Sequence, residues 1–246
     1  MNKKGIRLLF ISLFLLQITP LFSQDVTNQL WTSGFLHHTF RDRLRVLTEL
    51  SYRHVLNQDD KWSKYQNQYD FRYSILNSLD IHAGSFFIYT SHNEEYKDLD
   101  AFEIRPFVGA KYHITQNKRV NLRDYLRYEQ RFFMYSNTDE NNIYARLRNR
   151  VEVITSINRP DLNHEKLLYF NIDAEIFLNL NHDPEERFIN FFQSRIGPGY
   201  RFNYNWRAEI FYVLQLTKDD STALFNKSSN IIFFRFLYYT TRKPKS

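Results

Sequence analysis

The chain contains no cysteine. This excludes disulfide bridges, thiolate zinc sites, cysteine nucleophiles and a lipid anchor on cysteine. Glycine and proline are also scarce, with six of each among 246 residues, which excludes collagen-like or Gly/Pro linker architecture. Long apolar runs are missing as well. After the first 23 residues, no stretch approaches the ~18 continuous apolar residues that a membrane-spanning helix requires.

Charge is nearly balanced along most of the chain. Lys and Arg number 33 and Asp and Glu 27, giving a formal charge of +6. Three of the positive charges, Lys3, Lys4 and Arg7, lie within the first seven residues. The remainder is too balanced to indicate a nucleic-acid partner, and we expect none. Aromatic residues are abundant instead, with 23 Phe, 17 Tyr and 3 Trp, which is more than the core of a soluble domain of this size needs.

The first 23 residues have the pattern of a secretory signal peptide. A basic segment precedes an apolar run at residues 8–18. A helix of that length rises only about 16 Å, roughly half of a bilayer core. Small Ser23 precedes Gln24, and we expect cleavage between them. The sequence therefore predicts a signal peptide at residues 1–23 and a single exported domain at residues 24–246.

Beyond Gln24, apolar and polar residues alternate with a period of two. Phe102, Ile104 and Val108, for example, alternate with Glu103 and Arg105. Such alternation places the two sets on opposite faces of a β-strand. About ten units of this kind occur between residues 43 and 239, each roughly 10–14 residues long. Soluble strands are usually five or six residues long, whereas a tilted strand that crosses a bilayer needs about 9–11.

We therefore predict an all-β fold, an antiparallel up-and-down transmembrane β-barrel of about 10–12 strands. Its apolar face would meet lipid and its charged face would line the lumen. Tyrosines recur at the ends of the units, as the aromatic girdles of such barrels require; they are Tyr73, Tyr89, Tyr112, Tyr200 and Tyr238. Residues 30–40 resemble an eleventh unit, and because bacterial barrels have even strand counts, either this segment is not a full strand or two strands have been merged. The alternative fold is a secreted β-sandwich that acts as a binding module.

The connections between units alternate in length. Residues 74–78, 115–118 and 203–205 are short, whereas residues 57–62, 91–100, 135–142, 180–186 and 217–228 are longer and polar. Outer-membrane barrels have short periplasmic turns and longer external loops. Residues 157–165 are longer than the other short connections, but Arg159, Pro160 and Asp161 have turn chemistry, so we expect a long periplasmic turn there.

The charged face of the predicted strands carries the candidate functional residues. The lumen-facing candidates are Arg45, Glu49, Arg53, Arg72, Glu103, Arg105, Arg123, Arg127, Glu129, Arg131, Arg146, Arg148, Arg150, Glu152, Glu175, Arg195, Arg207, Glu209 and Arg235. The alternation places Arg43, Arg201 and Asp173 on the same face. Arg–Glu pairs can fill a small barrel while satisfying one another. The functional interpretation is an anion-selective passage or a site for an acidic ligand, because Arg outnumbers acid on this face.

Several of these positions form short motifs. The chain opens with Trp31-x-x-Gly34-Phe35 and continues with Glu49-x-x-x-Arg53, Glu103-x-Arg105, Arg127-x-Glu129-x-Arg131, Arg146-x-Arg148-x-Arg150, Arg195-x-Gly197-x-Gly199 and Ala208-Glu209-x-x-Tyr212. In these motifs the sequence resembles the domain of unknown function 2490 family, uncharacterised outer-membrane barrels of Bacteroidetes. The resemblance covers nearly all of the exported domain. It implies a location and a fold, and it supplies no substrate, reaction or catalytic residue.

Catalytic and metal motifs are weak. The eight histidines include neither a strand pair at i, i+2 nor an H-E-x-x-H, so we expect no metal site. Ser91 with His92, and Ser85 with His82, are the only Ser–His neighbours, and neither has the context of a nucleophile elbow. We expect no enzyme and no cofactor. An outer-membrane lipid acyl hydrolase is the alternative from another functional class.

Taken together, the sequence predicts a protein of the outer membrane of a Gram-negative bacterium. Its role would be structural or that of a narrow, anion-preferring channel lined by Arg and Glu. The expected partners are outer-membrane lipid and, during biogenesis, periplasmic chaperones and the barrel-insertion machinery. A small anionic solute is the expected ligand class.

Overall fold

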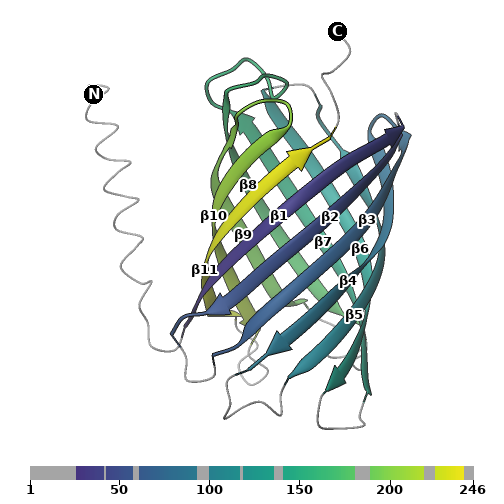
Figure 1. The fold of residues 1–246 in the computed structure, drawn as a ribbon, viewed down its shortest axis with the longest axis vertical. Helices are drawn as coiled ribbons and strands as arrows, with labels where there is room; N and C mark the ends of the chain where they lie inside the picture. The colour runs from purple at the N-terminus through teal and green to yellow at the C-terminus, as the bar shows by residue number, and fades with distance from the viewer. Residues whose placement is uncertain are drawn as a thin grey trace.

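The computed structural model describes residues 26–41, 43–57, 61–92, 100–116, 119–135, 141–180, 189–218 and 225–240. The predicted signal peptide and its cleavage site at Ser23 and Gln24 lie outside these ranges. The described residues form eleven β-strands (Figure 1). They are β1 (Thr27–Arg41), β2 (Leu44–Val55), β3 (Ser63–Leu76), β4 (Leu79–Ser91), β5 (Ala101–His113), β6 (Val120–Tyr135), β7 (Asn141–Ser156), β8 (Leu167–Asn179), β9 (Ile189–Arg201), β10 (Trp206–Lys218) and β11 (Phe225–Tyr239). Among these residues, no helix is long and apolar enough to cross a membrane.

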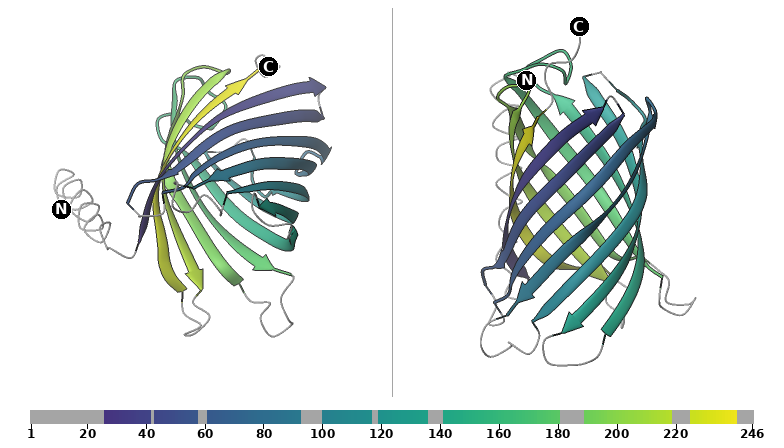
Figure 2. Two further views of the ribbon diagram at one scale, coloured as in Figure 1. Left: turned by 60° about the horizontal axis from the view of Figure 1, so that its bottom comes forward. Right: turned by 45° about the vertical axis from the view of Figure 1, so that its right-hand side comes forward.

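The strands close into a single barrel, in the order β1-β11-β10-β9-β8-β7-β6-β5-β4-β3-β2 (Figure 2). Consecutive strands pair in antiparallel fashion, as predicted. Every strand of the described chain has two neighbours, so there is one closed sheet. The alternative of a two-sheet sandwich is therefore wrong.

The pair of strands that closes the barrel shows that the strand count is odd, so the expectation of an even count was wrong. Residues 27–41 form a full strand, and β1 pairs with β11 in parallel, with Thr27 opposite Ser229 and His37 opposite Tyr239. When successive strands alternate in direction, an odd count makes the first and the last strand run the same way. Eleven strands can thus close only through a parallel seam, whose hydrogen bonds are evenly spaced but slanted. We call the β1–β11 pair the seam.

The two ends of the barrel differ in their connections. At one end, here called the turn end, segments of two to six residues follow β1, β3, β5 and β9, the ten residues 157–166 follow β7, and β11 finishes. At the other, the loop end, segments of five to nine residues follow β2, β4, β6, β8 and β10, and β1 begins. The views in Figure 1 and Figure 2 agree on this arrangement. The predicted alternation of short and long connections is therefore present in part, because the connection at 157–166 is the longest and the one at 114–119 is longer than the one at 136–140.

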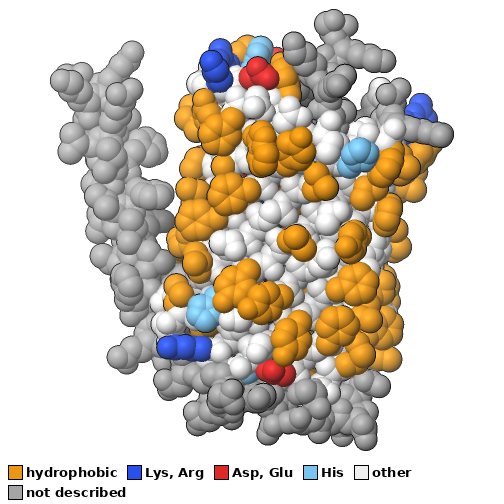
Figure 3. Space-filling view, viewed as in Figure 1, with side chains coloured by type: hydrophobic (Ala, Val, Ile, Leu, Met, Phe, Trp, Pro, Cys, Tyr) orange, Lys and Arg blue, Asp and Glu red, His pale blue; other side chains and the backbone are white. Residues whose placement is uncertain are grey.

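The two faces of each strand are reversed relative to those of a soluble protein, with the apolar face outside and the polar face inside. The strands are 12 to 16 residues long and turn their apolar phase outward, where Phe71, Val108 and Ile210 are about half exposed. Figure 3 shows hydrophobic side chains spread over the middle of one face, with Lys, Arg, Asp and Glu only near the ends. The polar phase points inward, where Asp70 and Glu129 have 0% of their area exposed. Carboxylates are almost never buried without partners, so the interior must supply countercharges.

The long turn at residues 157–166 is folded against the turn end of the barrel. Asn158 accepts a hydrogen bond from the backbone of Leu168 and donates one to the carbonyl of Lys166, at 2.8 and 3.0 Å. Lys166 has a φ of 51°, the left-handed conformation that reverses the chain tightly. Leu162 packs with Ile154, Leu167 and Tyr169 inside the barrel. The turn predicted from Arg159, Pro160 and Asp161 thus also covers part of this end.

Candidate functional site: the charged lumen

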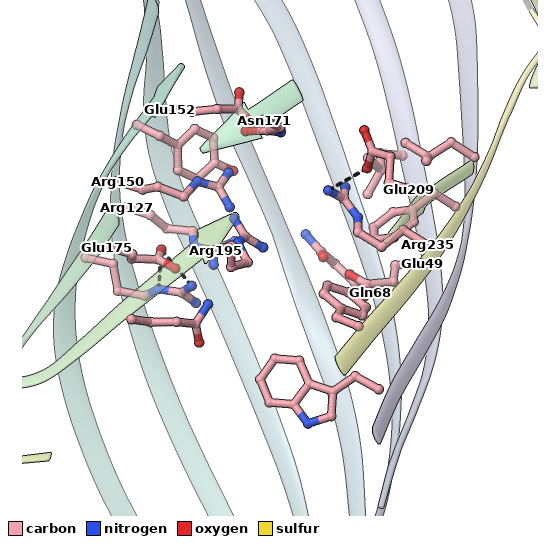
Figure 4. Close-up of a pocket in the computed structure, with 18 of the residues that line it drawn as sticks. Glu49, Gln68, Arg127, Arg150, Glu152, Asn171, Glu175, Arg195, Glu209 and Arg235 are labelled. Atoms are coloured by element: carbon pink, nitrogen blue, oxygen red, sulfur yellow. Dashed lines mark hydrogen bonds and ion pairs between the residues drawn. The ribbon is translucent and has the colours of Figure 1, made fainter. Parts of the chain in front are cut away.

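The inner face of the barrel encloses a cavity of about 390 Å³, which we call the lumen. All but three of the lumen-facing candidates line it; they are Glu49, Arg53, Arg72, Arg105, Arg123, Arg127, Arg131, Arg146, Arg148, Arg150, Glu152, Glu175, Arg195, Arg207, Glu209 and Arg235. Figure 4 shows Arg127, Arg150 and Arg195 reaching from one wall toward Arg235 and Glu49 on the other. These side chains come from strands all around the barrel.

The three remaining candidates do not line the cavity. Glu103 and Glu129 lie on the inner face but are buried against the wall beneath arginines. Arg45 ion-pairs with Asp80 at 2.6 Å, and its side chain is 40% exposed. Arg43, which shares their phase in the sequence, is an exposed turn residue between β1 and β2. A turn has no strand alternation, so the phase of Arg43 carried no information about its face.

Among the described residues, Glu129 is the centre of the largest ion-pair network. Its carboxylate lies 2.9 Å from Arg127, 2.5 Å from Arg146 and 2.7 Å from Arg148, with Arg105 at 4.0 Å. These arginines come from β5, β6 and β7, so one carboxylate ties three strands together. A buried carboxylate is stable only when paired and hydrogen-bonded, and here several guanidinium groups meet that need.

Other acids continue this network along the wall formed by β5 to β9. Glu103 accepts hydrogen bonds from Arg105 and Arg131, both with closest distances of 2.7 Å. Arg148 donates to Glu175 at 2.7 Å as well as to Glu129, so it links β6, β7 and β8. Two further pairs on this wall are Arg123 with Glu152 and Arg195 with Asp173.

A second network lies nearer the turn end, on β3 to β6. Asp70 accepts two hydrogen bonds from Arg72, at 2.6 and 2.9 Å, and lies 3.4 Å from His82. His82 also bonds the hydroxyl of Tyr125 at 3.1 Å. Nearby Asp80 pairs with Arg45 and His113. These two aspartates are not among the predicted candidates, although the alternation of the sequence places both on the charged face.

Cations outnumber acids around the lumen. Fifteen Lys and Arg residues line the cavity, against four Glu. Several of these cations form no ion pair with any acid among the described residues; they are Arg53, Lys64, Lys111, Arg150, Arg201 and Arg207. Three of them stack on aromatic rings instead, at 4.0 to 4.9 Å from the ring centroid. The lumen is therefore a positively charged compartment.

The candidate Ser–His neighbours do not resemble a catalytic pair. Ser85 bonds the carbonyl of Phe86, whereas His82 points into the second network. His92 is bound through its backbone to Asp100 at 2.6 Å. The described residues do contain another contact, between His54 Nδ1 and Ser63 Oγ at 2.9 Å. These two residues face each other across β2 and β3, a proximity that only the strand register reveals.

Within the described ranges, no group of three His, Cys, Asp or Glu residues could hold a metal ion. His37 and His38 point to opposite faces of β1, as their adjacency requires. His37 stacks on Tyr239 inside the barrel, and His38 bonds Thr240.

Comparison with known proteins identifies the family alone. No curated protein matches the chain. The model of the family described as "Protein of unknown function (DUF2490)" matches residues 28–226, from β1 into β11. This match covers well over half of the sequence and includes the motifs that carried the resemblance, so the chain belongs to the DUF2490 family.

Proposed function

We propose that the protein is an outer-membrane β-barrel of a Gram-negative bacterium whose lumen admits small anions. The observation that carries this proposal is the lining of the lumen by fifteen Lys and Arg against four Glu. A low-dielectric passage with an excess of one charge concentrates the opposite ion. A barrel of this size is narrower than the porins that hold wide channels, so only small solutes would fit.

The location is supported by the outer surface and by the amino-terminal sequence. Apolar and aromatic side chains cover the outward phase of the strands, and charge gathers at the two ends (Figure 3). Tyr73, Tyr89 and Tyr112 are exposed at strand ends, where an aromatic girdle would meet the lipid headgroups. The signal-like residues 1–23 would direct export. Outer-membrane lipid, periplasmic chaperones and the insertion machinery are the partners that this location implies.

Fractionation tests the location. The protein should sediment with the outer membrane, and its unboiled band should migrate differently from its boiled band in SDS gels. A closed barrel resists the detergent because its sheet has no free edge at which to unfold. Recovery in the soluble fraction without a boiling-dependent shift would contradict the proposal.

Conductance in planar bilayers tests the role. Across a KCl gradient, the reversal potential of the wild type should indicate a preference for chloride over potassium. Replacing Arg127 and Arg148 with Ser should raise the conductance, because two long side chains leave the lumen, and should weaken the anion preference. Arg159→Ser, on the exposed turn outside the lumen, serves as the control for an arginine lost elsewhere. A cation preference in the wild type, or no conductance in either protein, would refute the passage.

We propose no catalytic role. The alternative of a lipid acyl hydrolase has one supporting observation, the Ser63–His54 contact of 2.9 Å at the loop end. A nucleophile also needs a carboxylate or amide that orients the histidine, and within the described residues no such partner contacts His54. Fatty-acid release from phospholipid vesicles that Ser63→Ala and His54→Ala abolish would reverse this assignment. The same assay with His92→Ala addresses the Ser91–His92 neighbours.

A further inference from the structure

Two arginines face each other at the turn end of the lumen without an acid between them. Arg201 ends β9, Arg207 lies near the start of β10, and the two are direct register partners. Both line the lumen. Side chains directly opposite in an antiparallel pair have their Cβ atoms about 5 Å apart, and like charges in that position destabilise the sheet.

The neighbours of this pair offer no countercharge. Leu167 on β8 is the register partner of Arg201, and Leu237 on β11 is the partner of Arg207. Both leucines are almost fully buried, and Arg201 itself is 8% exposed. The two arginines therefore lie in a row of four inward side chains, flanked by apolar groups on each side. In such surroundings an unpaired charge is costly.

The acid that is nearest to Arg207 in the sequence of β10 already has two partners. Glu209 accepts a hydrogen bond from the Tyr169 hydroxyl at 2.5 Å and ion-pairs with Arg235 at 2.9 Å. Arg201 does donate to the backbone carbonyl of His164, at 3.3 Å. The Nε atoms of Arg201 and Arg207, however, are buried without a hydrogen-bond partner. The pair thus retains donors that the described protein does not satisfy.

The seam supplies the adjoining wall. The guanidinium of Arg207 lies 4.3 Å from the ring centroid of Tyr239, and the His37 ring stacks on the same tyrosine at 4.3 Å. The Nε2 atom of His37 is also buried without a partner. Arg201, Arg207, Tyr239 and His37 come from four consecutive strands, β9, β10, β11 and β1. Buried polar atoms without a hydrogen-bond partner occur elsewhere in the lumen as well, for example on Arg53 and Arg150, and three of them gather here.

The long turn covers this region. Leu162 is 7% exposed and packs with Leu167 and Tyr169, and its side chain lines the same lumen. His164 on the turn holds Arg201 through its carbonyl. The pocket around the two arginines is therefore restricted on the turn side and continuous with the rest of the lumen.

We propose that Arg201 and Arg207 form a binding site for a doubly charged oxyanion of the phosphate type. Two guanidinium forks match the tetrahedral oxygens of such an anion, and a dianion would neutralise both charges at once. The site rests on the proposed anion preference of the lumen and adds to it a fixed position and a ligand class. Free phosphate and the phosphate group of a small metabolite share this chemistry.

Calorimetric titration of the detergent-refolded protein with inorganic phosphate tests the site. The wild type should bind one phosphate, and chloride at the same ionic strength should not replace it. Glucose 6-phosphate in a second titration distinguishes a site open to phosphate monoesters from one that accepts only the free ion. Arg207→Met should weaken phosphate binding at least tenfold. Arg159→Met, which removes an exposed charge at the same end of the barrel, should leave binding unchanged.

Thermal unfolding separates a binding site from a structural pair. Without phosphate, Arg207→Met should unfold at the same or a higher temperature than the wild type, because it removes like-charge repulsion from an apolar row. Phosphate should raise the unfolding temperature of the wild type and leave that of Arg207→Met unchanged. A wild type that binds no phosphate, or equal binding by both proteins, overturns the site.

The outcome is independent of the conductance test. A barrel that prefers chloride in bilayers but binds no phosphate retains the proposed function and loses this site. A barrel that binds phosphate at Arg201 and Arg207 without conducting retains the site and loses the passage.

Discussion

At the scale of single residues, the protein places charge where soluble proteins place their apolar core. Glu129 has no exposed area, yet three arginines lie within 2.9 Å of its carboxylate. The network holds because each buried charge has partners from neighbouring strands. Breaking such a network from one side leaves uncompensated charge in a low dielectric, which costs far more than the loss of an exposed pair.

Glu129→Gln should therefore destabilise the barrel by about 3–5 kcal/mol, the range for removing one partner of a buried ion pair. The amide preserves shape but no longer neutralises Arg127, Arg146 and Arg148. Urea unfolding of the protein refolded in lipid vesicles measures the loss. Glu165→Gln is the matched control, because Glu165 is exposed and its remaining oxygen can still accept the hydrogen bond from Tyr204. Equal midpoints for the two variants would show that Glu129 does not hold the wall together.

Sequence alone indicated which residues share the charged face, because alternation with a period of two is a local property. It could not indicate their partners. Arg148 meets Glu129 on one neighbouring strand and Glu175 on the other, and Arg201 meets Arg207. Such pairings depend on register and on the stagger of strands around the barrel. The two arginines therefore had the right phase, while the absence of an acid between them could be seen only in the fold.

At the scale of strands, a proline interrupts the ladder between β9 and β10. The β9–β10 register runs from Gly199 opposite Glu209 to Ile196 opposite Tyr212, with no paired residues between them. Pro198 lies in this gap, and it has no N–H to donate. Beside it, Gly197 approaches the β10 backbone so closely that an added Cβ would overlap the carbonyl of Ile210. The two backbones therefore come close at a point where the ladder is interrupted.

Gly197→Ala should accordingly destabilise the barrel by about 1–3 kcal/mol, the usual cost of overpacking a tight site. The heating temperature at which the folded band disappears from an SDS gel provides the measurement. Gly34→Ala is the control, since a Cβ at Gly34 meets no atom within 4 Å. If the alanine were tolerated equally at both positions, the close approach of β9 to β10 would not constrain the barrel.

The extent of each strand was largely readable from the alternation, and the turns from their short polar connections. The role of the long turn was not. Arg159, Pro160 and Asp161 indicate a change of direction, but the packing of Leu162 against Ile154 and Leu167 depends on where the barrel wall lies. The same limit applied to β1, whose residues 27–41 alternate like a strand but whose partners are distant in sequence.

At the scale of the whole molecule, the odd strand count places the start of the first strand and the finish of the last strand at opposite ends of the barrel. β1 starts at the loop end and β11 finishes at the turn end. A barrel with an even count has both termini on one side, so the start of β1 is where the eleven-strand arrangement departs from the bacterial pattern. Local alternation gives no information about which edges meet, and the seam therefore could not be predicted.

The absence of cysteine allows this arrangement to be tested without background labelling. Single cysteines at Thr27, the first residue of the seam, and at Lys61, between β2 and β3, should lie on the same side of the membrane. A cysteine at Asn163, on the long turn, should lie on the other side. In intact cells, a membrane-impermeant maleimide should label the first two positions, with Asn163 labelled only after permeabilisation. If positions 27 and 163 are labelled under the same conditions and position 61 is not, the seam is not formed and β1 does not close the barrel.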